Sequence, residues 1–70
     1  MDLNKKRQEI IFLAMFENKI NKRQLSNILG MSYPTMLNKL KFTGNFKIRE
    51  ADNLCNYLNI NLTEFITLKN

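Results

Sequence analysis

Gly30 separates two short segments that each open with a helix-capping pattern, and this arrangement constrains the fold more than any other feature of the chain. Asn21 precedes the first segment, with Gln24 three residues later as in a capping box. Ser32 precedes the second segment, and Pro34 follows in its first turn, where a missing N–H does no harm. Apolar residues recur at helical spacing behind both starts, namely Leu25, Ile28, Leu29, Met36 and Leu40. We therefore expect two short helices joined by a tight turn.

Two such helices joined through a glycine form a helix-turn-helix arrangement, which we place at about residues 21–41. Ser26 is small where the second helix has to cross closely, and Met31 fills the space below the turn. Gly30 ends the first of the two helices, because glycine takes a positive φ without steric cost. Each residue therefore has the type that this geometry requires.

The remainder of the chain also has a helical pattern. We expect a first helix from Leu3 or Asn4 to Asn18, with Asn18 left-handed at its end. Its apolar positions are Ile10, Leu13 and Ala14, together with the neighbouring Ile11. Further helices are expected over 48–58 and 62–66. The fourth helix should bury Ile48, Ala51, Leu54, Cys55 and Leu58, and the five phenylalanines, at 12, 16, 42, 46 and 65, should lie mostly in the core. No alternating run or hairpin signal predicts a strand, so we expect an all-α fold of five helices and one domain over residues 1–70.

The chain has 70 residues, one cysteine and no histidine, which excludes several classes of protein. No intrachain disulfide can form, and a reducing, intracellular setting is the natural inference. Zinc-finger sites and most nucleophile–base catalytic sites need side chains that this chain lacks. Its longest apolar stretch, residues 10–16, is far below the roughly 20 residues that span a bilayer. We expect no enzyme activity, no cofactor, no metal and no membrane partner.

The net charge of +5 is concentrated in the middle of the chain. Between Glu17 and Glu50 every charged residue is basic, whereas the two ends together are slightly acidic. The basic residues of this window are Lys19, Lys22, Arg23, Lys39, Lys41, Lys47 and Arg49. A segment of this kind indicates a polyanionic partner, although charge alone does not separate DNA, RNA, an anionic membrane or an acidic protein.

Residues 22–40, with the sequence KRQLSNILGMSYPTMLNKL, resemble the helix-turn-helix of the phage Cro and lambda-repressor-like (Cro/C1-type, XRE) superfamily. The resemblance extends from about Leu3 to Ile66 and is strongest to small Cro-like repressors of phages of Gram-positive bacteria. It departs from the common pattern at Ser26, at Lys39 and at Pro34. The resemblance implies a five-helix lambda-repressor-like domain in the bacterial cytoplasm, encoded by a phage or prophage, with double-stranded operator DNA as its partner.

The resemblance also implies a role for each residue of the interface. The third helix would enter the major groove, and its base-reading residues would be Tyr33, Pro34, Leu37 and Asn38. Asn38 is the best candidate, because an amide can bond N6 and N7 of adenine together. The phosphate contacts would be Lys22, Arg23, Gln24, Ser32, Thr35, Lys41, Thr43, Asn45 and Lys47.

The sequence leaves the dimer surface and the exact function open. Phe65, Ile66 and Leu68 are candidates for a homodimer surface, and the alternative is packing against the first helix of the same chain. The leading function is a sequence-specific transcriptional repressor. The alternatives are a modulator or antirepressor that binds a partner repressor protein, and an antitoxin or recombination accessory protein on the same scaffold.

Overall fold

The computed structural model describes residues 3–66, and this part of the chain is helical between its turns. The α-helices are α1 (Leu3–Glu17), α2 (Lys22–Ile28), α3 (Tyr33–Lys41), α4 (Ile48–Leu58) and α5 (Leu62–Ile66). A 3-10 turn, η1 (Thr43–Asn45), connects α3 to α4. The predicted all-α fold and its five helices are therefore confirmed.

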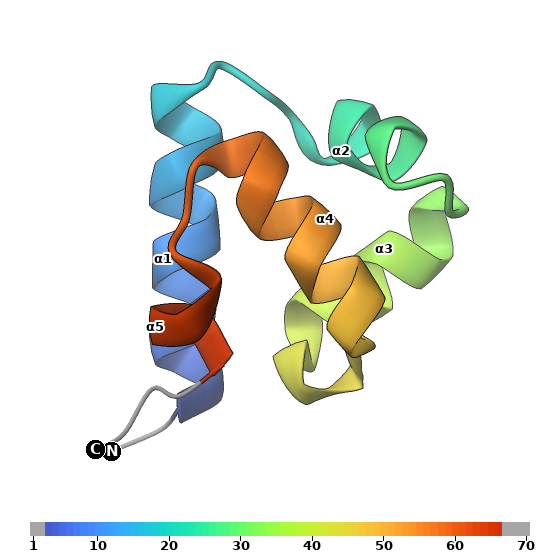
Figure 1. Cartoon of the computed structure of the whole chain (residues 1–70). Coiled ribbons are helices and arrows are strands. Elements are labelled where there is room, and N and C mark those ends of the chain that lie inside the picture. The colour runs from blue at the N-terminus through green and yellow to red at the C-terminus, as the bar shows by residue number, and fades with distance from the viewer. Residues whose placement is uncertain (1–2, 67–70) are drawn as a thin grey trace.

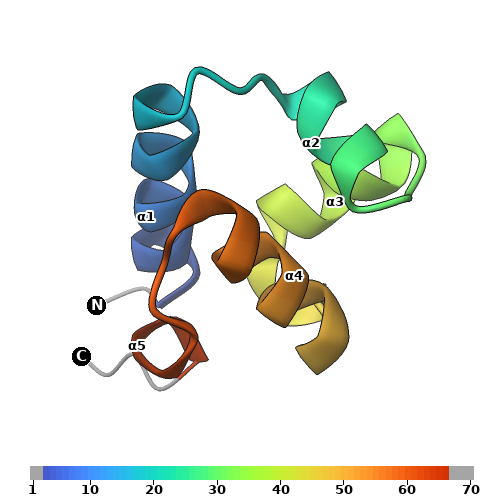
Figure 2. The ribbon, with the colours of Figure 1, turned by 45° about the horizontal axis from the view of Figure 1, so that its top comes forward.

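The helices form two groups that α4 holds together (Figure 1). α1 and the short α5 lie together on one side, and α2 and α3 form the pair on the other side. α4 runs between the two groups in both Figure 1 and Figure 2. The segment after α1 crosses to α2, so the C-terminal end of α1 and the start of α2 lie at the same end of the molecule on either side of this connection.

One contiguous core joins every helix of the fold. It takes Ile11 and Met15 from α1, Leu25 from α2, and Met36 from α3. The remaining buried apolar residues are Ala14, Leu40, Ala51, Leu54, Cys55, Leu58 and Phe65. Because α3 contributes Met36 and Leu40 to this core, the opposite face of α3 is left facing outward.

Helices α1, α2 and α4 are each followed by a residue in the left-handed conformation: Lys19 (φ 56°), Gly30 (φ 66°) and Asn59 (φ 60°). The next residue then donates its N–H five residues back, as Ile20 does to Met15, Met31 to Ser26, and Ile60 to Cys55. Ile20, Met31 and Ile60 are apolar, and all three pack against the core. The same end geometry therefore turns the chain inward three times.

This geometry confirms the predicted role of Gly30 and corrects the predicted end of α1. We placed the left-handed residue at Asn18, but Lys19 has the positive φ. The side-chain amide of Asn18 instead donates to the Ala14 carbonyl at 2.7 Å, which closes the last turn of the helix. The left-handed residue is Lys19 because it directly precedes Ile20, the apolar residue that has to reach the core.

Several large apolar residues that we expected in the core are exposed. Leu13 and Ile48 leave 60% and 68% of their surface in solvent, and Phe12, Phe16 and Phe42 are exposed as well. On α1 the buried stripe consists of Ile11, Ala14 and Met15. That stripe turns Leu13 and Phe12 to its two outer sides, so their helical spacing did not identify the buried face.

Candidate nucleic-acid interface

The α2–α3 pair is built by local caps that the sequence predicts. Asn21 Oδ1 accepts from the Gln24 backbone N–H at 2.7 Å, and Gln24 Oε1 accepts from the Asn21 N–H at 2.9 Å. Ser32 Oγ accepts from the Thr35 N–H at 3.3 Å at the start of α3. These bonds satisfy backbone donors that a helix start leaves without partners, so both helices begin at defined residues.

Ser26 allows α2 and α3 to pack closely. It is buried, and its hydroxyl donates to the Arg23 carbonyl within α2 at 2.6 Å. The buried polar group of Ser26 is therefore satisfied within its own helix. Leu25, beside it on α2, is fully buried in the same core as Met36 on α3.

The outer face of α3 carries the residues predicted to read bases. Pro34, Leu37 and Asn38 are exposed, and Tyr33 is half-buried. Residues three and four apart share one face of a helix, so these side chains form a continuous surface over the first two turns of α3. The structure thus brings the predicted reading residues together on a single face.

Asn38 is joined to the turn that follows α3. Its Oδ1 accepts from Nδ2 of Asn45, in η1, at 3.3 Å. The carboxamide oxygen of Asn38 has a second lone pair, and the nitrogen of its amide retains both donor hydrogens. The contact therefore orients the Asn38 amide while leaving it able to donate and accept, a link between the two residues that the sequence did not suggest.

Arg23, on α2, stacks on a residue of α3. Its guanidinium carbon lies 4.3 Å from the centroid of the Tyr33 ring, well within the range of a cation–π contact. Arg23 is exposed, and its guanidinium keeps hydrogen-bond donors that the ring does not use. Tyr33 therefore holds a basic group at the N-terminal end of the exposed α3 face.

Two lysines beside the interface also lie over aromatic rings. Lys22 Nζ is 5.4 Å from the centroid of Phe12, and Lys41 Nζ is 5.6 Å from the centroid of Phe42. Phe12 and Phe42 leave 40% and 49% of their surface exposed, so neither ring is a core residue. These contacts restrict long lysine side chains that otherwise sample many rotamers.

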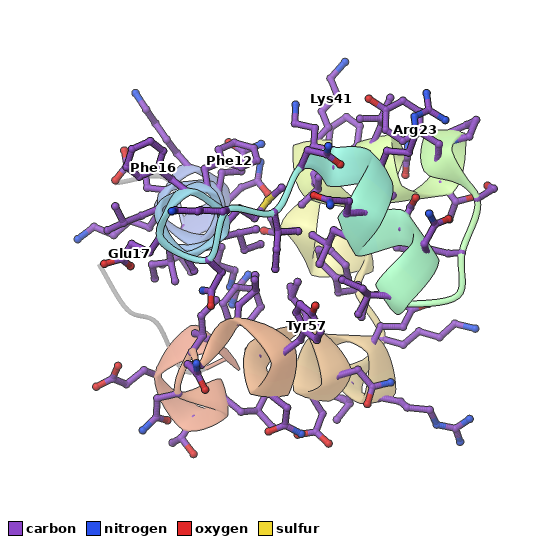
Figure 3. All side chains as sticks on the ribbon, turned by 90° about the horizontal axis from the view of Figure 1, so that it is seen from above. Phe12, Phe16, Glu17, Arg23, Lys41 and Tyr57 are labelled. Carbon is purple, nitrogen blue, oxygen red and sulfur yellow. The ribbon has the colours of Figure 1, made fainter. Side chains whose placement is uncertain are left out.

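Figure 3 shows on which side of the molecule these side chains lie. Viewed from above, α4 and α5 lie on one side of the molecule, and four labelled residues point to the other side. These residues are Phe12, Phe16, Arg23 and Lys41. Basic and aromatic groups from α1, α2 and α3 therefore share one face.

The C-terminal end of α3 is held by two side chains of α1. Asn4 Nδ2 donates to the Lys41 carbonyl at 2.8 Å, and Gln8 Nε2 donates to the Leu40 carbonyl at 2.9 Å. Asn4 Oδ1 in turn accepts from the backbone N–H and the hydroxyl of Thr43 at 2.7 and 2.6 Å. One asparagine thus joins α1, the end of α3 and the start of η1.

This arrangement changes the role expected of Thr43. We predicted a phosphate contact, but Thr43 is 97% buried, with 3% of its surface exposed, and its hydroxyl is bonded to Asn4. Thr43 therefore positions the turn and is not exposed to a ligand. The other predicted phosphate-contacting residues are exposed: Lys22, Arg23, Gln24, Ser32, Thr35, Lys41, Asn45 and Lys47.

Lys39 is taken out of the basic surface by an ion pair with Glu50 in the first turn of α4. Glu50 Oε1 also accepts from the Lys47 backbone N–H at 2.9 Å. The hydrogen bond from Lys39, helped by that from the Lys47 backbone, lowers the pKa of the Glu50 carboxyl below its ordinary value. The pair links α3 to α4 and gives the half-buried ammonium of Lys39 a partner.

Of the three residues predicted to form a dimer surface, Phe65 is the one whose side chain the structure describes. Phe65 is 2% exposed and belongs to the core, so it does not form part of an outer surface. Arg7 Nε donates to the Phe65 carbonyl at 3.1 Å, and its guanidinium lies over the Phe65 ring. The alternative, packing against the first helix of the same chain, is therefore correct for Phe65. The side chain of Ile66 and all of Leu68 lie outside the described residues.

Residues 3–66 present neither a metal site nor a membrane-spanning helix. No cluster of three or more Cys, Asp or Glu side chains in this region is arranged to hold a metal ion. No helix within it has the length and apolar character needed to cross a membrane. Cys55 is buried, and this burial, followed by the nearby charge of Asp52, raises the pKa of its thiol.

Comparison with known protein families identifies the scaffold. A family model described as the Cro/C1-type HTH DNA-binding domain matches residues 14–70. The chain belongs to this Cro/C1-type family. No match was found among curated proteins or among solved structures. Membership of this family supports double-stranded DNA as a ligand of the domain.

Proposed function

We propose that this Cro/C1-type domain is a sequence-specific transcriptional repressor that reads operator half-sites with α3 in the major groove. The observation that carries the proposal is the division of α3 into two faces. Met36 and Leu40 are buried, whereas Pro34, Leu37 and Asn38 are exposed together. A recognition helix has to present its N-terminal residues to base edges in this way.

The chemistry of the exposed face favours particular base pairs. Asn38 can accept from N6 and donate to N7 of the same adenine. Leu37 and Pro34 can make only apolar contacts, for which the thymine methyl group is the partner in the major groove. We therefore expect A·T pairs at the positions that α3 contacts.

Phosphate contacts complete the proposed interface. Lys22, Arg23 and Lys41 are exposed at the two ends of the reading face, and each lies over an aromatic ring that limits its movement. Phosphate contacts fix the register and orientation of a protein on the duplex but carry no sequence information directly. Lys47, Ser32, Thr35, Gln24 and Asn45 are the further candidates for this role.

We further propose that the repressor is of the phage Cro type and binds as a homodimer. A single copy presents only a few residues that can reach bases, so two copies on one operator would double the sequence that is read. Their half-sites would be separated by about one helical turn, roughly 34–36 Å. The second candidate function is binding to a partner repressor protein. For that function, the duplex selection described next should enrich no sequence over random duplex.

The test is an unbiased selection of bound duplexes from a random library at low salt, carried out with the full chain. We expect an enriched, A·T-containing site with two related half-sites. Binding to that site should exceed binding to random duplex by at least about 10³-fold. If the selection enriches no sequence over random duplex, the chain is not a sequence-specific repressor.

A further inference from the structure

A groove lies between the C-terminal end of α1 and the start of the α2–α3 pair. We call it the α1–α2 groove, and it has a volume of about 590 Å³. The side chains that line it are Phe12, Met15, Phe16, Ile20, Asn21, Lys22, Arg23 and Tyr33. An adjoining hollow shares Met15, Phe16 and Ile20 and adds Lys19 and Gln24 to the lining.

Phe16 makes this groove unusual for an isolated domain. It leaves 82% of its surface exposed, and Phe12 beside it leaves 40% exposed. Neither ring supports the core, where Ile11, Ala14 and Met15 supply the buried stripe of α1. Neighbouring exposed aromatic residues, rimmed by polar groups, are typical of a surface that another molecule covers.

The charges around the groove restrict what that molecule can be. Lys19, Lys22 and Arg23 stand at its edge, and none of the residues that line the groove or the adjoining hollow is acidic. Glu17 follows Phe16 in the sequence but points away from Phe12 and Phe16 (Figure 3). It lines a different hollow, together with Leu13 and Ile60. The groove therefore suits a partner that is apolar in the middle and acidic at its edges.

We propose that the α1–α2 groove binds an acidic amphipathic helix of another protein. Its apolar face would cover Phe12, Phe16 and Ile20, and its carboxylates would face Lys19, Lys22 and Arg23. Duplex DNA offers no apolar ridge for the phenylalanines, and a second copy of this chain would bring a further net charge of +5 to a basic rim. The exposed phenylalanines therefore favour an acidic helix over DNA, and the basic rim favours it over a second copy.

Such a partner would also interfere with DNA. Arg23 and Tyr33 line the groove and belong to the proposed DNA interface. The side chains of Phe16 and Arg23 also point to the same side of the molecule (Figure 3). An acidic helix in the groove would occupy Arg23 and bring carboxylates to the place of a phosphate, so the partner would displace DNA. This last step rests on the proposed function, whereas binding in the groove does not.

The first experiment measures groove binding without DNA. Peptides are selected from a displayed random library against the full chain, and the enriched peptides are synthesised and titrated by fluorescence anisotropy. We expect acidic, amphipathic sequences. Phe16→Ser should weaken their binding at least about tenfold, and Lys19→Glu about fivefold. Tyr57→Ser and Lys5→Glu, which change an exposed aromatic residue and an exposed lysine outside the groove, should leave binding unchanged.

The proposal is overturned if no peptide is enriched, if the enriched peptides are not acidic, or if Phe16→Ser leaves their affinity intact. Sedimentation of the unliganded chain provides a separate check. If Phe16→Ser converts a dimer into a monomer, the groove is occupied by a second copy and the acidic partner is wrong.

The second experiment adds the selected peptide to the chain bound to its preferred duplex. Release of the duplex, with no release by a peptide of the same composition and scrambled order, supports the competition. Simultaneous binding of peptide and duplex overturns the competition. A chain that binds the peptide but no duplex at all contradicts the proposed repressor function while leaving the groove assignment in place.

Discussion

Asn38 is the residue of α3 best suited to discriminate between bases, because its exposed amide offers one acceptor and two donor hydrogens. We predict that Asn38→Ala lowers the affinity for the preferred duplex by about 1–3 kcal/mol and relaxes the preference at one base pair. The measurement is a titration of the variant with the selected site and with every single-base change at the contacted positions.

The matched control for Asn38 is Asn56→Ala, which removes an exposed amide from α4, outside the proposed interface. Its affinity and base preference should equal those of the unmodified chain. An equal loss for all duplexes in Asn38→Ala would show that Asn38 contacts the backbone and does not read a base.

The roles of single residues were predictable wherever they depend on neighbours in the sequence. Asn21, Gln24 and Ser32 form their expected caps, because a cap needs only the next three residues. Asn4 was not predictable as the residue that holds the end of α3, because its partners lie 37 and 39 positions away. The burial of Thr43 follows from that same contact and was missed for the same reason.

At the scale of the helix, the left-handed residues offer a test of how each helix ends. Lys19 adopts φ 56°, which is costly for a residue with a Cβ, whereas Gly30 adopts φ 66° without that cost. We predict that Lys19→Gly raises the free energy of unfolding by about 0.5–1 kcal/mol, and that Gly30→Ala lowers it by about 1 kcal/mol. Urea denaturation measures both changes.

The control for these two variants is Lys19→Ala, which removes the lysine side chain but retains a Cβ in the strained conformation. It should not produce the gain seen with glycine. No atom lies within 4 Å of a Cβ built on Gly30, so the loss in Gly30→Ala would come from the backbone conformation and not from a clash. Equal stability of Lys19→Gly and Lys19→Ala would contradict the left-handed end of α1.

The ion pair between α3 and α4 gives the fold a dependence on pH. The pKa of Glu50 is lowered in the folded chain, mainly by its hydrogen bond from Lys39. A carboxyl of this kind stabilises the fold above its unfolded-state pKa, and the contribution is lost as the pH falls through the lower, folded-state pKa. Below the ordinary value of 4.5, stability should therefore decrease.

We predict that Glu50→Gln removes part of this decrease, because glutamine retains the shape but cannot titrate. Near neutral pH the variant should be less stable than the unmodified chain by about 0.5–1 kcal/mol. When the pH is lowered, the free energy of unfolding should fall less in the variant than in the unmodified chain. Urea denaturation at neutral pH and at about pH 3 gives the change in unfolding free energy with pH for each of the two proteins. Parallel loss of stability in both proteins would show that Glu50 does not contribute to the acid sensitivity.

For the molecule as a whole, the concentration of basic residues was predictable, but the surface that they form was not. The acid-free window of the sequence contains α2, α3 and η1, which is the part of the fold that carries the proposed interface. Lys39 does not contribute to that surface, because Glu50 lies against it from α4. Phe12 and Phe42 are exposed and not part of the core, and a lysine ammonium lies over each ring. Helical periodicity predicts which apolar residues share one face of a helix, but the packing of the helices decides which of them are buried.

The salt dependence of binding tests the proposed assembly on DNA. Four exposed cations, Lys22, Arg23, Lys41 and Lys47, are available to phosphates in each copy of the chain. Release of counterions from B-DNA then gives a slope of log K against log salt of about −4 for one copy and about −7 for a dimer. We predict the steeper slope on a two-half-site duplex and the shallower slope on a duplex that carries one half-site.

Lys41→Ala should reduce the magnitude of the slope by about 1 per copy for all sequences alike, whereas Lys5→Ala, outside the interface, should not change it. An identical slope on the two duplexes would mean that a single copy occupies the operator, and a loss in Lys41→Ala confined to the preferred sequence would mean that Lys41 reads a base.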